Sequence, residues 1–212
     1  MKKKIWIIMI GILLLALDFK VPVGRLYPSM IKDLTIGEEL QLRIVNNFIG
    51  TRPLFDVIPD LLGFALIFIG CALLVRKNIR FFVAMLLIPI AMYYYIRLPL
   101  LPYQLESRDL YLTVAGNQII LITIEILIEF FVIHGIVTMT NCLQNNWNNN
   151  ELLGGWIIAM MSKGLLVGID FFFGEHIFYV IYYLIFLGAT VFYLNRLLKT
   201  LEFNPGEIIK TA

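Results

Sequence analysis

Charged side chains are scarce in this sequence. Only 15% of its 212 residues are Asp, Glu, Lys or Arg, whereas 60% are hydrophobic, and the mean hydropathy is +0.85. A soluble globular domain carries about 25% charged residues, because its surface faces water. The composition therefore excludes an ordinary soluble domain and predicts a protein whose surface faces lipid.

Cysteine and histidine are also rare, with two of each. Cys71 falls in an apolar run and Cys142 in a polar stretch, which argues against a disulfide framework. The sequence has no P-loop, no C-x-x-C pair and no G-x-S-x-G nucleophile turn. The net charge is only +2 and the basic residues are scattered, so nothing indicates a nucleic-acid partner. We expect a protein that is not an enzyme and needs no cofactor or metal.

Long apolar runs are what the sequence has in abundance. A helix that crosses a bilayer needs about 20 mostly apolar residues. Six runs approach this length, at residues 5–19, 57–75, 81–99, 112–137, 153–173 and 177–194. The first is short and follows Lys2–Lys4, as a signal peptide would, but no small-x-small cleavage site follows Leu17, which favours a retained anchor. The expected fold is an all-α, polytopic membrane helix bundle forming one domain over residues 1–212.

Basic residues near the span ends predict the orientation. A six-span arrangement brings most of them to one side: Lys2, Lys3, Lys4, Arg76, Lys77, Arg80, Arg196 and Lys199. The positive-inside rule makes this side cytoplasmic and places both termini there. The loop expected at 138–151 would be cytoplasmic too, although it contains no Lys or Arg.

Two connections between spans are long. The external segment 18–57 contains G-E-E-L-Q-L-R-I-V-N-N-F-I at residues 37–49, whose apolar positions share one helical face. This pattern predicts a short helix that lies on the membrane or caps the bundle. The other connection, 138–151, is rich in asparagine and predicts a solvated cytoplasmic loop.

Two hairpins of the predicted bundle resemble each other. Residues 13–19 and 165–171 are L-L-L-A-L-D-F and L-L-V-G-I-D-F, and residues 66–70 and 184–188 are L-I-F-I-G and L-I-F-L-G. Spans 1–2 and 5–6 would then be parallel repeats, an architecture that transport proteins use, with the site between the repeats. Chance similarity of apolar helices is the alternative. A true repeat would make Asp18 and Asp170 equivalent.

A few ionisable residues fall inside the predicted spans. Gln118, Glu125 and Glu129 lie on one face of the fourth span, and Lys163 lies in the fifth. Charges at this depth are costly, so they usually face the interior and have a partner. We therefore expect Lys163 to lie within direct or one-water reach of Glu125 or Glu129. A G-x-x-x-G pattern at Gly164 and Gly168 predicts close approach of another helix to the fifth span.

Two interpretations of this intramembrane polar site stay open. Lys163 and one glutamate can neutralise each other as a structural pair. Alternatively, the two carboxylates and the lysine can form a proton or ion relay.

A second set of acidic residues falls at the predicted external level. Asp56 and Asp60 flank Pro59 at the start of the second span, where acidic groups favour the positive end of a helix dipole. Capping alone would explain both residues. With Asp18 and Asp170, they could instead form an external acidic cluster that attracts cations.

The stretch I-P-D-L-L-G-F at residues 58–64 and the L-D-F and I-D-F helix ends resemble uncharacterised multi-pass bacterial membrane proteins. The resemblance covers about a third of the chain, and its motifs are short. The resemblance implies localisation in the bacterial inner membrane and no particular activity.

Two further patterns are similar to motifs of intramembrane metalloproteases of the prenyl-protein-processing and bacteriocin-immunity type, E-E-x-x-x-R from residue 38 and F-x-x-x-H from residue 130. In that family such glutamates and histidines surround a metal-activated water. Here the glutamates are predicted on the opposite side of the membrane from His134. The expected third motif is also missing, because His176 is not followed four residues later by Asn or Asp. A protease is therefore disfavoured.

The favoured functional hypothesis is a small transporter or permease-like protein for a cation or small solute. The alternative is a non-catalytic scaffold or regulatory subunit that binds a protein partner, or a second copy of itself, in the bilayer.

Overall fold

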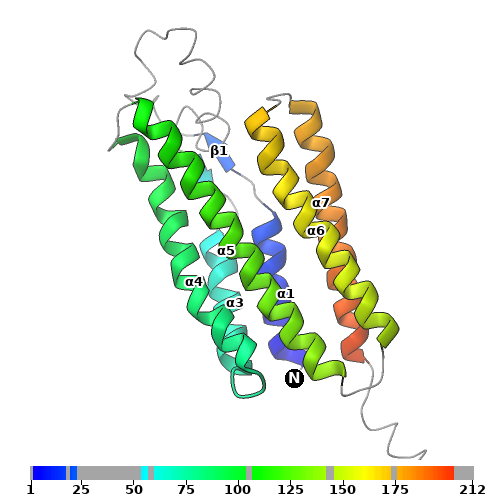
Figure 1. Cartoon of the computed structure of the whole chain (residues 1–212). Helices are drawn as coiled ribbons and strands as arrows, with labels where there is room; N and C mark the ends of the chain where they lie inside the picture. Colours follow the sequence, from blue (N-terminus) through cyan, green and yellow to red (C-terminus); the bar gives the residue numbers. More distant parts are fainter. Residues whose placement is uncertain are drawn as a thin grey trace, which may run out of the picture.

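The computed structural model describes residues 2–17, 20–22, 54–56, 60–103, 107–141, 146–172 and 176–202. Six α-helices account for nearly all of these residues. Successive helices run in opposite directions, and the first begins at the end of the bundle where the last one ends (Figure 1). Each predicted span coincides with one helix, so the all-α prediction is confirmed. The helices are α1 (Lys2–Ala16), α3 (Asp60–Leu74), α4 (Ile79–Arg97), α5 (Ser107–Asn141), α6 (Asn146–Phe172) and α7 (His176–Glu202), with a 3-10 helix η2 (Leu98–Tyr103) after α4.

Three helical segments are long and apolar enough to cross a membrane: Ile79–Leu101, Thr113–Met139 and Val180–Lys199. Helices α1 and α3 have 15 residues each, which gives them a length of about 22 Å. This is shorter than the roughly 30 Å hydrocarbon core of a bilayer. The described structure is thus that of a helical membrane protein with three clear candidate spans, and the six-span count stays a prediction.

A small two-stranded ribbon joins the two ends of the segment 18–57. Strand β1 (Lys20–Pro22) pairs antiparallel with β2 (Leu54–Asp56), and Lys20 lies opposite Asp56. The sequence patterns did not indicate this ribbon. The helix expected at residues 37–49 lies outside the described residues.

The expected asparagine-rich loop at 138–151 is mostly helical, so that prediction is wrong. Helix α5 continues to Asn141, and α6 begins at Asn146. Asparagine is only a moderately poor helix former, costing less than about 0.7 kcal/mol per residue relative to alanine. Helices that extend beyond the apolar region can therefore carry asparagine at their polar ends.

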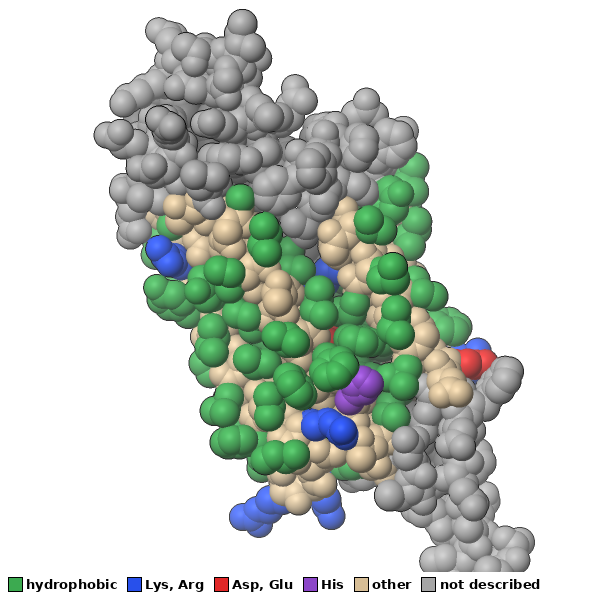
Figure 2. Space-filling view, in the orientation of Figure 1, with side chains coloured by type: hydrophobic (Ala, Val, Ile, Leu, Met, Phe, Trp, Pro, Cys, Tyr) green, Lys and Arg blue, Asp and Glu red, His purple; other side chains and the backbone are tan. Residues whose placement is uncertain are grey.

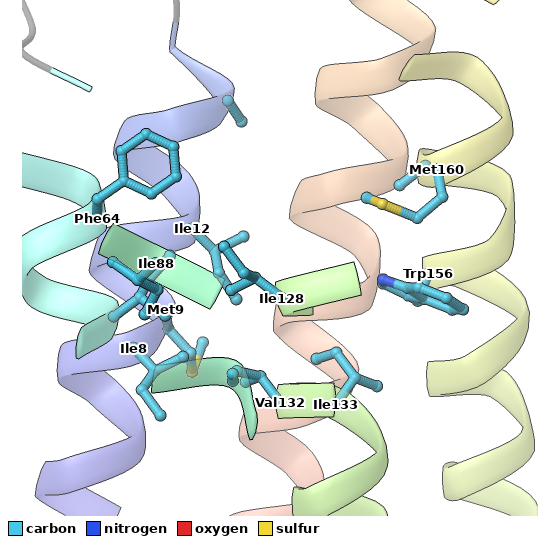
Figure 3. Close-up of a cluster of buried hydrophobic side chains, with 14 of the residues drawn as sticks. Ile8, Met9, Ile12, Phe64, Ile88, Ile128, Val132, Ile133, Trp156 and Met160 are labelled. Atoms are coloured by element: carbon cyan, nitrogen blue, oxygen red, sulfur yellow. The ribbon is translucent and has the colours of Figure 1, made fainter. Parts of the chain in front are cut away.

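The helices associate most closely as three pairs, α1 with α3, α4 with α5, and α6 with α7. Glycines permit the closest approach, because a Cβ on Gly11 would lie 2.7 Å from the carbonyl oxygen of Gly63, and one on Gly63 would lie 2.9 Å from the oxygen of Gly11. Figure 3 shows the apolar core between the pairs, where Ile128 and Val132 of α5 lie between α1 and the side of α6 that carries Trp156.

Apolar side chains also cover the outside of the bundle, as expected in lipid. On α4 the buried residues Phe81, Ala84, Ile88 and Ala91 alternate with an exposed stripe of Phe82, Leu86, Ile90 and Tyr93. Figure 2 shows hydrophobic side chains over the middle of the visible face and Lys and Arg side chains at its lower end.

Side-chain hydrogen bonds connect neighbouring helices at the end of the bundle that carries the basic residues. Asn78 caps α4 by accepting a bond from the backbone N–H of Arg80. The Arg80 guanidinium donates to the carbonyl of His134 at 3.4 Å and to the hydroxyl of Thr138 on α5. In the first turn of α1, Lys4 donates a hydrogen bond to the backbone carbonyl of Leu73 on α3, at 2.9 Å. These bonds join α1 to α3 and α4 to α5.

The two hairpins of the proposed repeat are both antiparallel helix pairs, but the glycines that the repeat would make equivalent have different surroundings. Both α1–α3 and α6–α7 are antiparallel neighbours (Figure 1). However, a Cβ on Gly70 would collide with Ile8, whereas one on Gly188 would meet nothing within 4 Å. Asp18 lies outside the described residues, so the equivalence of Asp18 and Asp170 stays a prediction.

Candidate functional site

An ion pair joins α5 to α6 in the apolar part of the bundle. Lys163 Nζ lies 2.6 Å from Glu125 Oε2 and 3.9 Å from Glu129 Oε1. The two glutamates are one helical turn apart, so both carboxylates reach the same ammonium. The prediction that Lys163 lies within direct reach of a glutamate on α5 is confirmed.

Tyr193 is a member of this cluster that the sequence analysis missed. Its hydroxyl donates a 2.7 Å hydrogen bond to Glu129 Oε2, and its side chain is fully buried. The bond connects α7 to α5, so the cluster links three helices. Tyrosine is common near membrane interfaces, and nothing in the local sequence distinguishes Tyr193 from an interfacial tyrosine.

Lys163 is further surrounded by an aromatic ring and a third acid. Its ammonium lies 5.9 Å from the centroid of the Phe186 ring on α7, within the range of a cation–π interaction. Asp60, the first residue of α3, also attracts the ammonium electrostatically and is only 8% exposed. Asp60 thus occupies the first turn of its helix, as capping predicts, and acts on the intramembrane site as well.

The cluster contains more acidic than basic groups. Glu125 and Glu129 both lie near a single ammonium, and the side chains of Lys163, Glu125 and Glu129 are 12%, 12% and 5% exposed. A structural ion pair would need only one carboxylate for one lysine. The additional acid needs a proton, a cation or strong hydrogen bonds to be tolerated at this depth.

Gln118 does not join the cluster. It lies seven residues before Glu125, about 10 Å along α5. Its Oε1 atom is buried and has no hydrogen-bond partner within the described ranges, and the same holds for Nδ2 of the adjacent Asn117. These amides lie at a different depth along α5 from the ion pair. No hydrogen bond connects Gln118 to Lys163 in the described part of the chain.

The external acidic cluster is only partly described. Asp18 lies outside the described residues, while Asp56 ends β2 and Asp170 lies near the end of α6. The remaining member, Asp60, is buried and acts on Lys163, so it is not a surface group of an open vestibule.

His134 lies away from the ion pair, as its helical angle predicts. Its ring packs 4.1 Å from that of Phe130 and 6.2 Å from that of Trp156, between centroids. The described residues contain no group of three or more His, Cys, Asp or Glu side chains arranged to hold a metal ion. The glutamates of the protease-like pattern, from residue 38, lie outside the described residues.

The predicted close approach at the G-x-x-x-G pattern of α6 is wrong at Gly164. This glycine is exposed, and a Cβ there would meet nothing within 4 Å. The close contact between α6 and α7 occurs two and a half turns earlier, where a Cβ on Gly155 would lie 2.7 Å from the Phe192 ring. The spacing of two glycines shows that a face is smooth, but does not show which face another helix covers.

Comparison with known proteins gives no independent assignment. No family model, curated protein or solved structure matches this chain.

Proposed function

We propose that this chain is a small membrane transport protein that moves a cation or small solute, and that Glu125, Glu129 and Lys163 form the group that binds or couples to it. The observation that carries the proposal is the excess of acid in the buried cluster, where two glutamates lie 2.6 and 3.9 Å from one ammonium. Ionisable groups inside a membrane most often mark substrate or proton pathways.

The geometry gives the two glutamates different tasks. Glu125 is in direct contact with Lys163 at 2.6 Å, so its charge is neutralised within the protein. Glu129 is 3.9 Å from the ammonium and is held by the Tyr193 hydroxyl. Glu129 is therefore the carboxylate that we assign to the transported or coupling cation.

We further propose six membrane crossings with both termini in the cytoplasm of a bacterium. The alternating directions of the six helices support this topology, as do the exposed basic residues Lys3, Arg76, Lys77 and Lys199 at the helix ends that it assigns to the cytoplasm. The short helices α1 and α3 would need local thinning of the bilayer or snorkelling of flanking lysines.

An ion-flux experiment tests the transport proposal. Purified protein is reconstituted into liposomes that contain a pH-sensitive dye, and gradients of K⁺, Na⁺, NH₄⁺ or choline are imposed, with and without a membrane potential. We expect proton or cation movement several-fold above that of protein-free liposomes, and loss of this excess in Glu129→Gln. Movement no faster than in protein-free liposomes under every gradient would contradict a cation transporter.

The second candidate is a non-catalytic scaffold, favoured by the position of the same bonds. Lys163–Glu125 and Tyr193–Glu129 join the α6–α7 pair to α5, which otherwise has few contacts with α6. If this structural role is the only one, a charge-neutral double substitution, Lys163→Met with Glu125→Gln, should preserve folding and function together. A transport role predicts that folding recovers and flux does not.

A further inference from the structure

Thr190 differs from the other hydroxyl residues inside the helices. Thr123, Thr138 and Ser162 each donate a hydrogen bond of 2.7–2.8 Å to the carbonyl four residues earlier in the same helix. Thr190 is only 1% exposed, and its Oγ1 atom has no hydrogen-bond partner among the described residues. Burying a hydroxyl without a hydrogen-bond partner destabilises a protein, so the isolation of Thr190 indicates a ligand that is not part of the chain.

Helical spacing places Thr190 on the face of α7 that contacts the buried cluster. Phe186, Thr190 and Tyr193 are spaced by four and three residues, which places them on one helical face. Phe186 faces the Lys163 ammonium and Tyr193 donates to Glu129. Thr190 lies between these two contacts along the helix, about 4.5 Å from the level of Tyr193.

We propose that Glu129, Thr190 and Tyr193 form a binding site for a monovalent alkali cation of the size of Na⁺. The inference rests on the proposed function, and it specifies the class of cation that the site binds. Glu129 supplies carboxylate Oε1, which at 3.9 Å is too far from Lys163 for a direct hydrogen bond. Thr190 and Tyr193 supply neutral hydroxyl oxygens, and waters complete the coordination.

The ligand chemistry favours a hard cation, and the charge of the neighbouring groups favours a monovalent one. Carboxylate and hydroxyl oxygens suit hard cations rather than transition metals, which prefer imidazole and thiolate. Lys163 and Glu125 neutralise each other beside the site, so one bound charge of +1 balances Glu129.

Thermal denaturation of the purified protein in detergent tests the site. The apparent Tm is measured in increasing NaCl, with choline chloride keeping the ionic strength constant. A saturable rise of roughly 3–5 °C is expected at a sodium concentration ten times the dissociation constant. Glu129→Gln and Thr190→Val should remove or strongly weaken this sodium-dependent rise.

Thr123→Val is the matched control, because its hydroxyl bonds to its own helix and it is exposed. This variant should keep the full sodium-dependent rise. Equal stabilisation by choline, or the same sodium response in Thr190→Val as in Thr123→Val, would overturn the inference. Ion flux in liposomes without sodium binding would refute this site while leaving the transport proposal intact. Sodium binding without ion flux would refute the transport proposal and leave this site intact.

Discussion

Replacing Lys163 with methionine should destabilise the protein strongly, because it leaves buried carboxylates without their ammonium. The lysine lies 2.6 Å from Glu125 and 3.9 Å from Glu129, and its side chain is 12% exposed. Removing one partner of a buried ion pair costs about 3–5 kcal/mol, so we expect a loss in this range in the free energy of unfolding. The loss should shrink at acidic pH, where a protonated carboxylate no longer needs a counter-charge.

Glu125→Gln should cost less than Lys163→Met, because the ammonium keeps Glu129 as a partner. The double variant should recover at least about 1 kcal/mol relative to the sum of the single losses, since the two side chains are in contact. Equilibrium unfolding by SDS in mixed micelles measures all three variants. Lys199→Met, on the exposed basic end of α7, should change stability by less than about 0.5 kcal/mol. Single losses that add within about 0.5 kcal/mol would refute the coupling between Lys163 and Glu125.

Three further predictions concern topology, helix packing and the tyrosine. With native cysteines removed, single cysteines at Asn46 and Asn148 should react with impermeant reagents from opposite faces of the membrane, and labelling from one face would exclude six crossings. Gly63→Ala should lower the apparent Tm, because the new Cβ would lie 2.9 Å from a carbonyl oxygen of α1, whereas Gly164→Ala, with open space around it, should not lower it. Tyr193→Phe should cost about 1.5–3 kcal/mol of unfolding free energy by removing a bond to a buried carboxylate, and an unchanged unfolding curve would show that this bond contributes nothing.

The ion pair was predictable because burial leaves few solutions for isolated charges. A single lysine inside an apolar helix must meet an acid at similar depth, and only Glu125 and Glu129 offered one. Hydroxyl residues carry no such constraint, because they can bond to their own helix. The roles of Tyr193 and Thr190 therefore depended on which face of α7 meets α5, a tertiary fact that the sequence does not encode locally.

The errors have similar physical causes. Helix ends beyond the apolar core lose the hydrophobic period that defines a span, so the helices through Asn141 and from Asn146 were predicted as a loop. The close approach of another helix to α6, expected at Gly164, occurs instead at Gly155, because packing depends on the neighbouring helix as well as on the glycine.

The β1–β2 ribbon fixes the two ends of the segment 23–53 relative to each other. Its strands hold Pro22 opposite Leu54, so residues 23–53 begin and end at one fixed point. Loop-closure entropy grows slowly with length, by only about 0.6 kcal/mol for each doubling. Changes in the length of this segment should therefore cost little free energy, because the pairing of β1 with β2 already brings its two ends together.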